Sequence, residues 1–178
     1  VWACRLLGGT ADERLATTDL IHPLAAAWEQ AGAHLFLLGA KAEVVEAAAD
    51  RLRHLYPGLQ ISSRDGYFTS AEVPALVSQI NAAQPTALLV GLGDPLQQAF
   101  VQENLSALRV GAVLTCGGLF DWLSGVNRRA PQWMIRAGLE WLWRMMIEPR
   151  RLAKRYLLGN TWFLTRLARD LIRTSRHR

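Results

Sequence analysis

Apolar residues between positions 34 and 115 alternate between short continuous runs and stretches with helical spacing. The continuous runs predict buried strands at 34–38, 59–61, 86–90 and 110–115. Helical spacing predicts helices at 20–31, 42–55, 70–83 and 95–108. Strands that alternate with helices indicate βαβ units. We therefore expect an α/β fold with a Rossmann-like, mostly parallel sheet flanked by helices.

The same spacing predicts which side chains of these helices point inward. We expect the inward set to be Leu24, Ala27 and Trp28, then Val45, Ala49 and Leu52, then Val73, Leu76, Val77 and Ile80, and finally Phe100, Val101 and Leu105. With helices packed on a parallel sheet, a ligand is expected at the carboxyl ends of the strands.

Glycine-bearing loops follow four of the predicted strands. They contain Gly39, Gly66, Gly91 with Gly93, and Gly117 with Gly118. Glycine lets the backbone approach a phosphate closely, while the next helix offers N–H donors. Turn geometry alone can also require glycine. The spacing matches neither GxGxxG nor GxxxxGK[ST], which disfavours a dinucleotide site and a P-loop.

The pattern changes after Asn127. Helical spacing predicts a helix over 131–147 with an apolar stripe of Ile135, Leu139, Leu142 and Met146. Pro149 suits the start of another helix, Gly159-Asn160 breaks or kinks it, and a helix resumes over 161–173. In that last segment one face carries Arg166, Arg169, Arg173 and Arg176, and another carries Leu164, Leu167 and Leu171.

Charge divides at the same place. Residues 1–127 hold seven Lys or Arg against twelve Asp or Glu, a net of −5, whereas residues 128–178 hold thirteen against three, a net of +10. We predict a core domain over 1–127 and a basic helical appendage over 128–178. Such asymmetry favours a phosphate-rich partner, either anionic lipid or nucleic acid, over a merely solvated helix face.

Tryptophan is concentrated in or just before the appendage, at Trp122, Trp133, Trp141, Trp143 and Trp162. Trp and Arg on amphipathic helices are typical of a membrane interface. The alternative is that these rings pack the appendage onto the sheet.

Composition and missing motifs exclude several classes of protein. With 51% apolar and 20% charged residues the chain is typical of a folded domain, and no apolar run reaches about 18 residues. Cys4 and Cys116 make no disulfide framework, which fits a cytosolic setting. The histidines His22, His34 and His54 stand singly, and HExxH, CxxC, GxSxG and Asp-x-Asp are all absent. We expect no metal and no cofactor.

Several sequence strings, taken in order, carry a resemblance to one family. GLGDPLQ at 91–97 resembles the GxGxPxQE segment of the WecG/TagA/CpsF glycosyltransferases. CGGLFDWLSG at 116–125 is similar to their GxxFDxxxG, and RAPQW at 129–133 to their RAPxW. GLEWLWR at 138–144 and EPRRLAKRY at 148–156 resemble GLEWxxR and EPxRLxxRY. Residues 65–68 and the segment from Arg14 to Leu20 also fit.

The resemblance implies an enzyme that transfers an N-acetylmannosamine-type sugar, without a metal. The donor would be a UDP-sugar, and the acceptor a polyprenyl-diphosphate-linked N-acetylglucosamine at the cytoplasmic membrane face. Such products feed cell-surface polysaccharides or teichoic-acid linkage units. The appendage would close over the site and touch an anionic membrane surface. A homo-oligomer is left open, and nucleic acid is not favoured as a partner.

The resemblance also implies roles in donor binding. Asp121 would recognise the uracil ring, although it can also cap the turn after Gly118. Tyr67 would stack near the nucleotide, and Gln97 would lie beside the reacting sugar or diphosphate. The predicted substrate-binding set is completed by Gly39, Gly91, Gly93, Pro95, Gly117, Gly118, Arg129 and Lys154.

Basic residues would neutralise the charge that develops on the leaving UDP. The family positions match Arg14, Arg144 and Arg151, which join Gln97 in the predicted catalytic set, with Lys154 nearby in the appendage. Arg144, Arg151 and Lys154 can alternatively anchor the chain to anionic lipid.

Some features depart from the family pattern. Gln98 stands where the family usually has Glu, and Thr17 where it usually has Gly. The family's general-base Asp lies upstream of the part that matches Val1-Trp2, so we expect this chain to lack an N-terminal part. The chain alone should then bind UDP better than it catalyses transfer. Two alternatives stay open, namely another UDP-sugar donor and a non-catalytic basic module that binds lipid or nucleic acid.

Overall fold

A computed structural model of the chain describes residues 2–10, 16–127, 129–147, 149, 159 and 161–170. The chain divides into two compact units. One comprises Ala16–Arg128, and the other comprises Val1–Leu15 together with Arg129–Arg178. The functional roles predicted for the core and the appendage remain predictions.

The first unit is built on a four-stranded sheet in which every pairing is parallel. Its strands are β1 (His34–Gly39), β2 (Gln60–Arg64), β3 (Ala87–Gly91) and β4 (Ala112–Thr115), in the order β2-β1-β3-β4. The helices are α2 (Thr17–Gln30), α3 (Ala42–Leu55), α4 (Val73–Ala83), α5 (Leu96–Asn104) and α6 (Leu119–Leu123), with a 3-10 turn η1 (Ser70–Glu72) before α4. The predicted α/β class, parallel sheet and flanking helices are confirmed.

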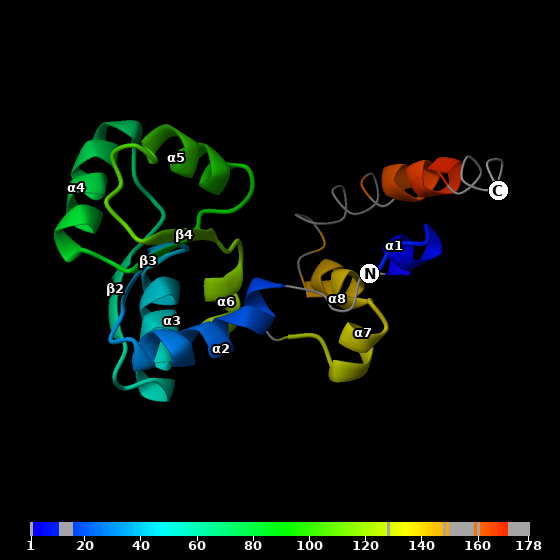
Figure 1. Cartoon of the computed structure of the whole chain (residues 1–178), viewed down its shortest axis with the longest axis horizontal. Helices are drawn as coiled ribbons and strands as arrows, with labels where there is room; N and C mark the ends of the chain where they lie inside the picture. Colours follow the sequence, from blue (N-terminus) through cyan, green and yellow to red (C-terminus); the bar gives the residue numbers. More distant parts are fainter. Residues whose placement is uncertain are drawn as a thin grey trace. The chain divides into compact units, whose positions relative to one another are not determined.

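Helices cover both faces of this sheet (Figure 1). On one face α2, α3 and α6 bury apolar side chains against Leu35, Leu37 and Leu89. On the other face α4 and α5 do so against Phe36, Leu38 and Leu88. Neighbouring residues of β1 thus point to opposite faces and both are buried, which explains why this strand reads as a continuous apolar run.

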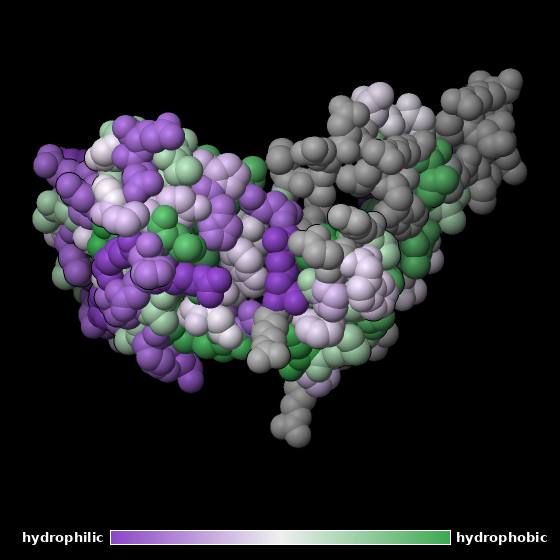
Figure 2. Space-filling model, turned by 90° about the horizontal axis from the view of Figure 1, so that it is seen from below, coloured by the Kyte–Doolittle hydropathy of each residue, from purple (hydrophilic) through white to green (hydrophobic). Residues whose placement is uncertain are grey.

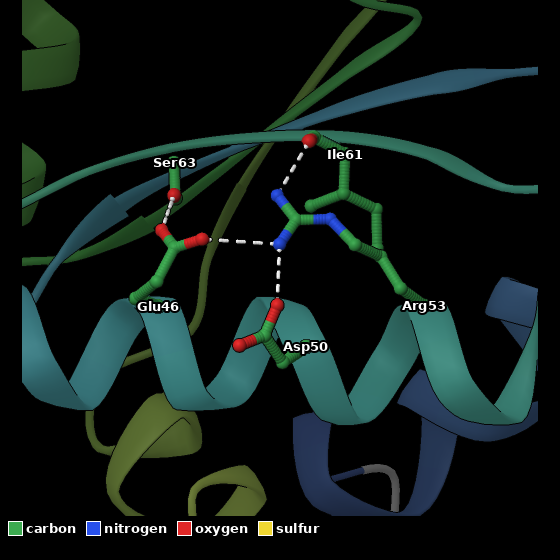
Figure 3. A network of polar contacts seen from close by, with 5 residues as sticks. All are labelled: Glu46, Asp50, Arg53, Ile61 and Ser63. Carbon is green, nitrogen blue, oxygen red and sulfur yellow. Dashed lines mark hydrogen bonds and ion pairs between the residues drawn. The ribbon is translucent and has the colours of Figure 1, made fainter.

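The edge strand β2 is held by polar contacts instead. Figure 3 shows Arg53 of α3 donating through Nη2 to the carbonyl oxygen of Ile61, 2.9 Å away, and through Nη1 to Glu46 and Asp50. Glu46 in turn accepts from the Ser63 hydroxyl at 2.5 Å. The network ties α3 to β2 and occupies one of the backbone acceptors that an edge strand would otherwise leave open.

Several details of the predicted helices are wrong. The predicted helix over 131–147 is two helices, α7 (Gln132–Arg136) and α8 (Glu140–Ile147). The reason is Gly138, whose φ of +73° ends α7 in a Schellman motif, with Gly138 N–H bonded to Ile135 O and Leu139 N–H to Met134 O. Leu105 lies beyond the end of α5 and is exposed. Ala27 is also exposed, because α2 turns Ile21 and Ala25 inward.

The second unit contains α1 (Trp2–Leu6), α7, α8 and helical residues 161–170. The prediction for residues 150–158 lies outside the described residues. Many of the unit's large apolar side chains are exposed, among them Trp133 and Trp162, each at 64%. In Figure 2 the visible face of the first unit is mostly hydrophilic, whereas the described atoms of the second are mostly pale or green. In the described part of the chain, no helix has the length and apolarity needed to cross a membrane.

Candidate nucleotide-binding site

The carboxyl ends of β1 and β3 meet without any intervening side chain. Gly39 pairs in register with Gly91. A Cβ on Gly39 would fall on the Gly91 carbonyl group, and the Gly39 φ of +145° also favours glycine. A Cβ on Gly91 would lie 2.7 Å from the Phe120 ring and 3.0 Å from the Gly117 carbonyl oxygen. The backbone of Gly39 and Gly91, packed on the Phe120 ring, therefore forms the floor of this edge.

Gly66 brings the loop after β2 over this floor. Its N–H donates to the carbonyl oxygen of Ala40, 2.9 Å away. A Cβ at Gly66 would lie 2.8 Å from Cδ2 of Leu92 and 3.0 Å from Cα of Gly39. The loop of the edge strand is therefore folded back across the end of β1 and toward the loop after β3.

Gln97 links the loop after β3 to the loop after β4. It lies in the first turn of α5 and is 7% exposed. Its Oε1 accepts from the Gly117 N–H at 3.0 Å, and its own N–H donates to Gly93 O at 2.9 Å. Because Oε1 is occupied by Gly117, the amide orientation is fixed. Among the described residues, no hydrogen bond involves Nε2, so its two donors remain for a ligand.

The loop after β4 carries Asp121 to the same edge. Cys116 N–H donates to Val90 O, which continues the pairing of β4 with β3. Gly117 has a φ of +54°, and Gly118 precedes α6. Asp121 lies in the first turn of α6 with Oδ2 close to Gly118. This placement fits the ligand role, whereas no side-chain cap hydrogen bond is made at the start of α6. Burial raises the pKa of Cys116 to about 12, so its thiol stays protonated at neutral pH.

Tyr67 extends from the loop after β2. Its backbone N–H donates to Oδ1 of Asp65 at 2.9 Å, while its side chain is 71% exposed. The next residue, Phe68, packs edge-to-face on Phe100 of α5 with ring centroids 5.8 Å apart. The Tyr67 ring is therefore not packed into its own loop and is open to stacking.

The predicted site residues thus separate into three groups. Those from the first unit gather at the carboxyl edge of its sheet: Gly39, Tyr67, Gly91, Gly93, Pro95, Gln97, Gly117, Gly118 and Asp121. Arg129 and Arg144 belong to the second unit, where Arg144 is exposed and 3.9 Å from the Glu140 carboxylate. Arg14, Arg151 and Lys154 lie outside the described residues.

This edge offers chemistry suited to a nucleoside diphosphate. Glycine backbone, an oriented amide, a carboxylate and an exposed phenol ring come from loops after different strands. Small residues let phosphate oxygens approach the backbone, while the carboxylate can accept from a base N–H and the ring can stack on the base. Within the described ranges, no three His, Cys, Asp or Glu residues cluster in a way that could hold a metal ion.

Sequence reasoning missed two contributors to this edge. Ala40 has a φ of +55° and accepts the bond from Gly66, which no local sequence signal announces. Asp65 fixes the backbone of Tyr67, and the Asp65-Gly66 pair after a predicted strand is a recognisable turn signal.

Comparison with known proteins agrees with the motifs. Residues 1–177 match the glycosyl transferase WecG/TagA/CpsF family. The chain is 32% identical over 152 residues to the N-acetylglucosaminyldiphosphoundecaprenol N-acetyl-beta-D-mannosaminyltransferase of Bacillus subtilis (strain 168). That match covers 85% of this chain and 59% of the relative's length. From the match over nearly its whole length, the chain belongs to the WecG/TagA/CpsF family of glycosyltransferases.

Proposed function

We propose that this chain binds the UDP-sugar donor of a metal-independent hexosyltransferase. The sugar would be N-acetylmannosamine, and the acceptor a polyprenyl-diphosphate-linked N-acetylglucosamine. The name of the Bacillus subtilis relative supports this transferred sugar and this acceptor. The observation that carries the proposal is that Tyr67, Gln97 and Asp121, from loops after three different strands, lie at one edge of the sheet.

The donor would lie across this edge. The backbone near Gly91, Gly93 and Gly117 would face the diphosphate, since an added Cβ at Gly93 or Gly117 would point into open space. Gln97 would donate from Nε2 to a phosphate or sugar oxygen, since its Oε1 is held by Gly117. Asp121 would accept the uracil imide N–H, and Tyr67 would stack on the base. The donor would thus be held by contacts that leave the sugar's reacting carbon free for the acceptor hydroxyl.

Transfer breaks the bond between the sugar and the UDP oxygen, and charge grows on that oxygen. Guanidinium groups stabilise such a charge well. By resemblance to the family, we assign this role to Arg14, Arg144 and Arg151, with Arg129 and Lys154 as further substrate contacts. The acceptor hydroxyl loses its proton to a base, a step typically worth about 10²–10⁴-fold in rate.

An anionic membrane surface is the partner we propose for the basic second unit. Residues 129–178, which belong to this unit, carry a net charge of +9, from twelve basic and three acidic residues. Trp133 and Trp162 are exposed, and the Arg166 guanidinium lies 5.4 Å from the Trp162 ring centroid. Exposed tryptophan beside arginine suits the headgroup region of a bilayer.

Calorimetric titration with UDP, without added metal, tests the donor site. We expect saturable binding by the unaltered chain. Removal of the Asp121 carboxylate should weaken it about tenfold or more, because a hydrogen bond to a charged group is worth about 1.5–3 kcal/mol. Gln97→Ala should also weaken binding. Asp50→Ala is the matched control, since its carboxylate lies on α3 and pairs with Arg53.

The outcomes of this titration test the UDP site, the place of the uracil contact and the identity of the donor sugar. No UDP binding by folded chain contradicts the proposed function. Equal losses in Asp121→Ala and Asp50→Ala contradict the placement of the uracil site. Competition by UDP-N-acetylmannosamine against UDP-glucose then distinguishes the proposed donor from another UDP-sugar.

A further inference from the structure

The loop that carries Tyr67 is fixed at both of its ends. It follows β2, which lies at the edge of the sheet and has a strand neighbour, β1, on one side only. The network of Glu46, Arg53 and Ser63 holds β2 against α3, up to the residue before Arg64 (Figure 3). On the far side of Tyr67, the Phe68 ring packs on Phe100. The segment between these anchors, residues 65–67, therefore determines where the Tyr67 ring lies.

Asp65 determines the backbone course of that segment. Its side chain is only 17% exposed, although it is a carboxylate at the end of an edge strand. Oδ1 accepts from the Tyr67 N–H at 2.9 Å, and Oδ2 pairs with Nη1 of Arg64. Both oxygens are thus occupied within the protein. Asp65 is therefore a poor ligand for substrate, and its side chain stabilises the turn instead.

The turn also needs Gly66 at its centre. Because Gly66 packs against Gly39 and Leu92, a larger residue would push the loop off the sheet edge. Asp65 and Gly66 together fold the loop inward while the Tyr67 side chain remains 71% exposed. Holding an exposed ring in one place lowers the ordering cost that binding would otherwise incur.

We propose that Asp65 is a positioning residue that holds the Tyr67 ring at the sheet edge for stacking on the donor's uracil base. The inference rests on the proposed function, because it needs a nucleotide at this edge. Arg64 supports Asp65 by neutralising its partly buried carboxylate. Asp65 itself makes no contact with the donor.

A double-mutant cycle with UDP as the ligand tests this proposal. Tyr67→Ala should weaken UDP binding about tenfold, since stacking of a base on an aromatic ring is worth about that much. Asp65→Ala should weaken UDP binding about fivefold when Tyr67 is present. In a Tyr67→Ala background the same substitution should change the UDP dissociation constant less than twofold, because the ring it positions is gone.

Two further variants separate positioning from a general loss of structure. Asp65→Asn keeps an oxygen that can accept from the Tyr67 N–H, so it should retain most of the UDP affinity. Glu72→Ala is the matched control, since Glu72 accepts from the Thr69 N–H at 2.7 Å beyond the Phe68 anchor. It should lower thermal stability without changing UDP affinity.

Amide hydrogen exchange at Tyr67 provides a readout that needs no ligand. Asp65→Ala should speed exchange of the Tyr67 N–H, whereas Glu72→Ala should not. Unchanged exchange at Tyr67, unchanged UDP affinity, or additive losses in the double-mutant cycle would each overturn the proposal. If the unaltered chain fails to bind UDP, the proposed function fails, and the exchange measurement still decides whether Asp65 fixes Tyr67.

Discussion

The two units of the chain place their apolar side chains differently. In the first unit, Leu35, Leu52 and Leu88 are fully buried between the sheet and its helices. In the second, several of the largest side chains lie on the surface: Trp133, Met146, Trp162, Phe163 and Leu164. The first unit therefore carries its own hydrophobic core, and the residues of the candidate site lie on loops at one edge of its sheet.

Charge follows the same division. The acidic excess lies in the residues of the first unit, and the basic excess lies after Asn127. An exposed apolar surface with basic residues around it is typical of an interaction surface. Apolar residues thus stabilise the first unit from within, whereas in the second many are exposed to solvent or to a partner.

Truncation of one large apolar residue in each unit tests this contrast most strongly. Leu52→Ala should lower the free energy of unfolding by about 2–5 kcal/mol, because it opens a cavity in the core. Trp162→Ala should change it by no more than about 0.5 kcal/mol, since the ring is mostly exposed. Urea unfolding measures both. The same Trp162→Ala should reduce co-sedimentation with anionic vesicles. A comparable loss of stability in the two variants would contradict the contrast.

A pair of glycine substitutions within the first unit should give a smaller effect. In Gly39→Ala the added Cβ would overlap the Gly91 backbone, and the φ at this position is unfavourable for alanine. We expect the overlap to lower the free energy of unfolding by about 1–3 kcal/mol, in addition to the backbone strain. Gly32→Ala is the matched control, because its φ is +62° but nothing lies within 4 Å of an added Cβ. It should cost only about 1–2 kcal/mol. If thermal unfolding shows equal losses of stability in the two variants, the close backbone approach at the sheet edge does not contribute to stability.

The polar network at β2 should give the smallest effect, and it should depend on pH. Hydrogen bonds from Ser63 and Arg53 hold the pKa of Glu46 below its usual 4.5. The charged form is thus favoured by folding, so its stabilisation is present above pH 4.5 and is lost as pH falls through the lowered pKa. Glu46→Gln should cost less than about 1 kcal/mol at pH 7, because the side chain is half exposed.

Comparison of unfolding at pH 7 and near pH 3 measures this dependence. The difference between Glu46→Gln and the unaltered chain should shrink at the lower pH. Ser63→Ala removes the hydroxyl donor to Glu46. The free energy of unfolding of this variant should therefore depend less on pH than that of the unaltered chain. A difference that grows on acidification would contradict the assignment.

Hydrophobic pattern alone predicted most of the first unit. The runs at 34–38 and 86–90 are buried on both faces, so they could be recognised as strands of a covered parallel sheet. The glycines after them marked the carboxyl edge of the sheet, where Gly39 and Gly91 approach each other too closely for a side chain. The strand at 60–64 was predicted too short, because Ser62, Ser63 and Arg64 are stabilised by partners on β1 and α3 rather than by burial.

Other features depend on contacts that no local pattern contains. The orientation of the Gln97 amide follows from Gly117, twenty residues away. Besides Asp65, the course of the Tyr67 loop depends on Ala40 and Phe100, which lie in other elements. In the second unit, helical periodicity continues across Gly138, so the pattern concealed the end of α7 that this glycine imposes.

Hydrogen–deuterium exchange of the chain with and without saturating UDP tests most directly whether a nucleotide binds at the carboxyl edge of the sheet. We predict slowed exchange in the loops at 65–68, 91–97 and 116–121, and no change over the exposed face of α3. Protection confined to other segments, or none at a UDP concentration that saturates binding, would contradict a nucleotide site at the carboxyl edge of this sheet.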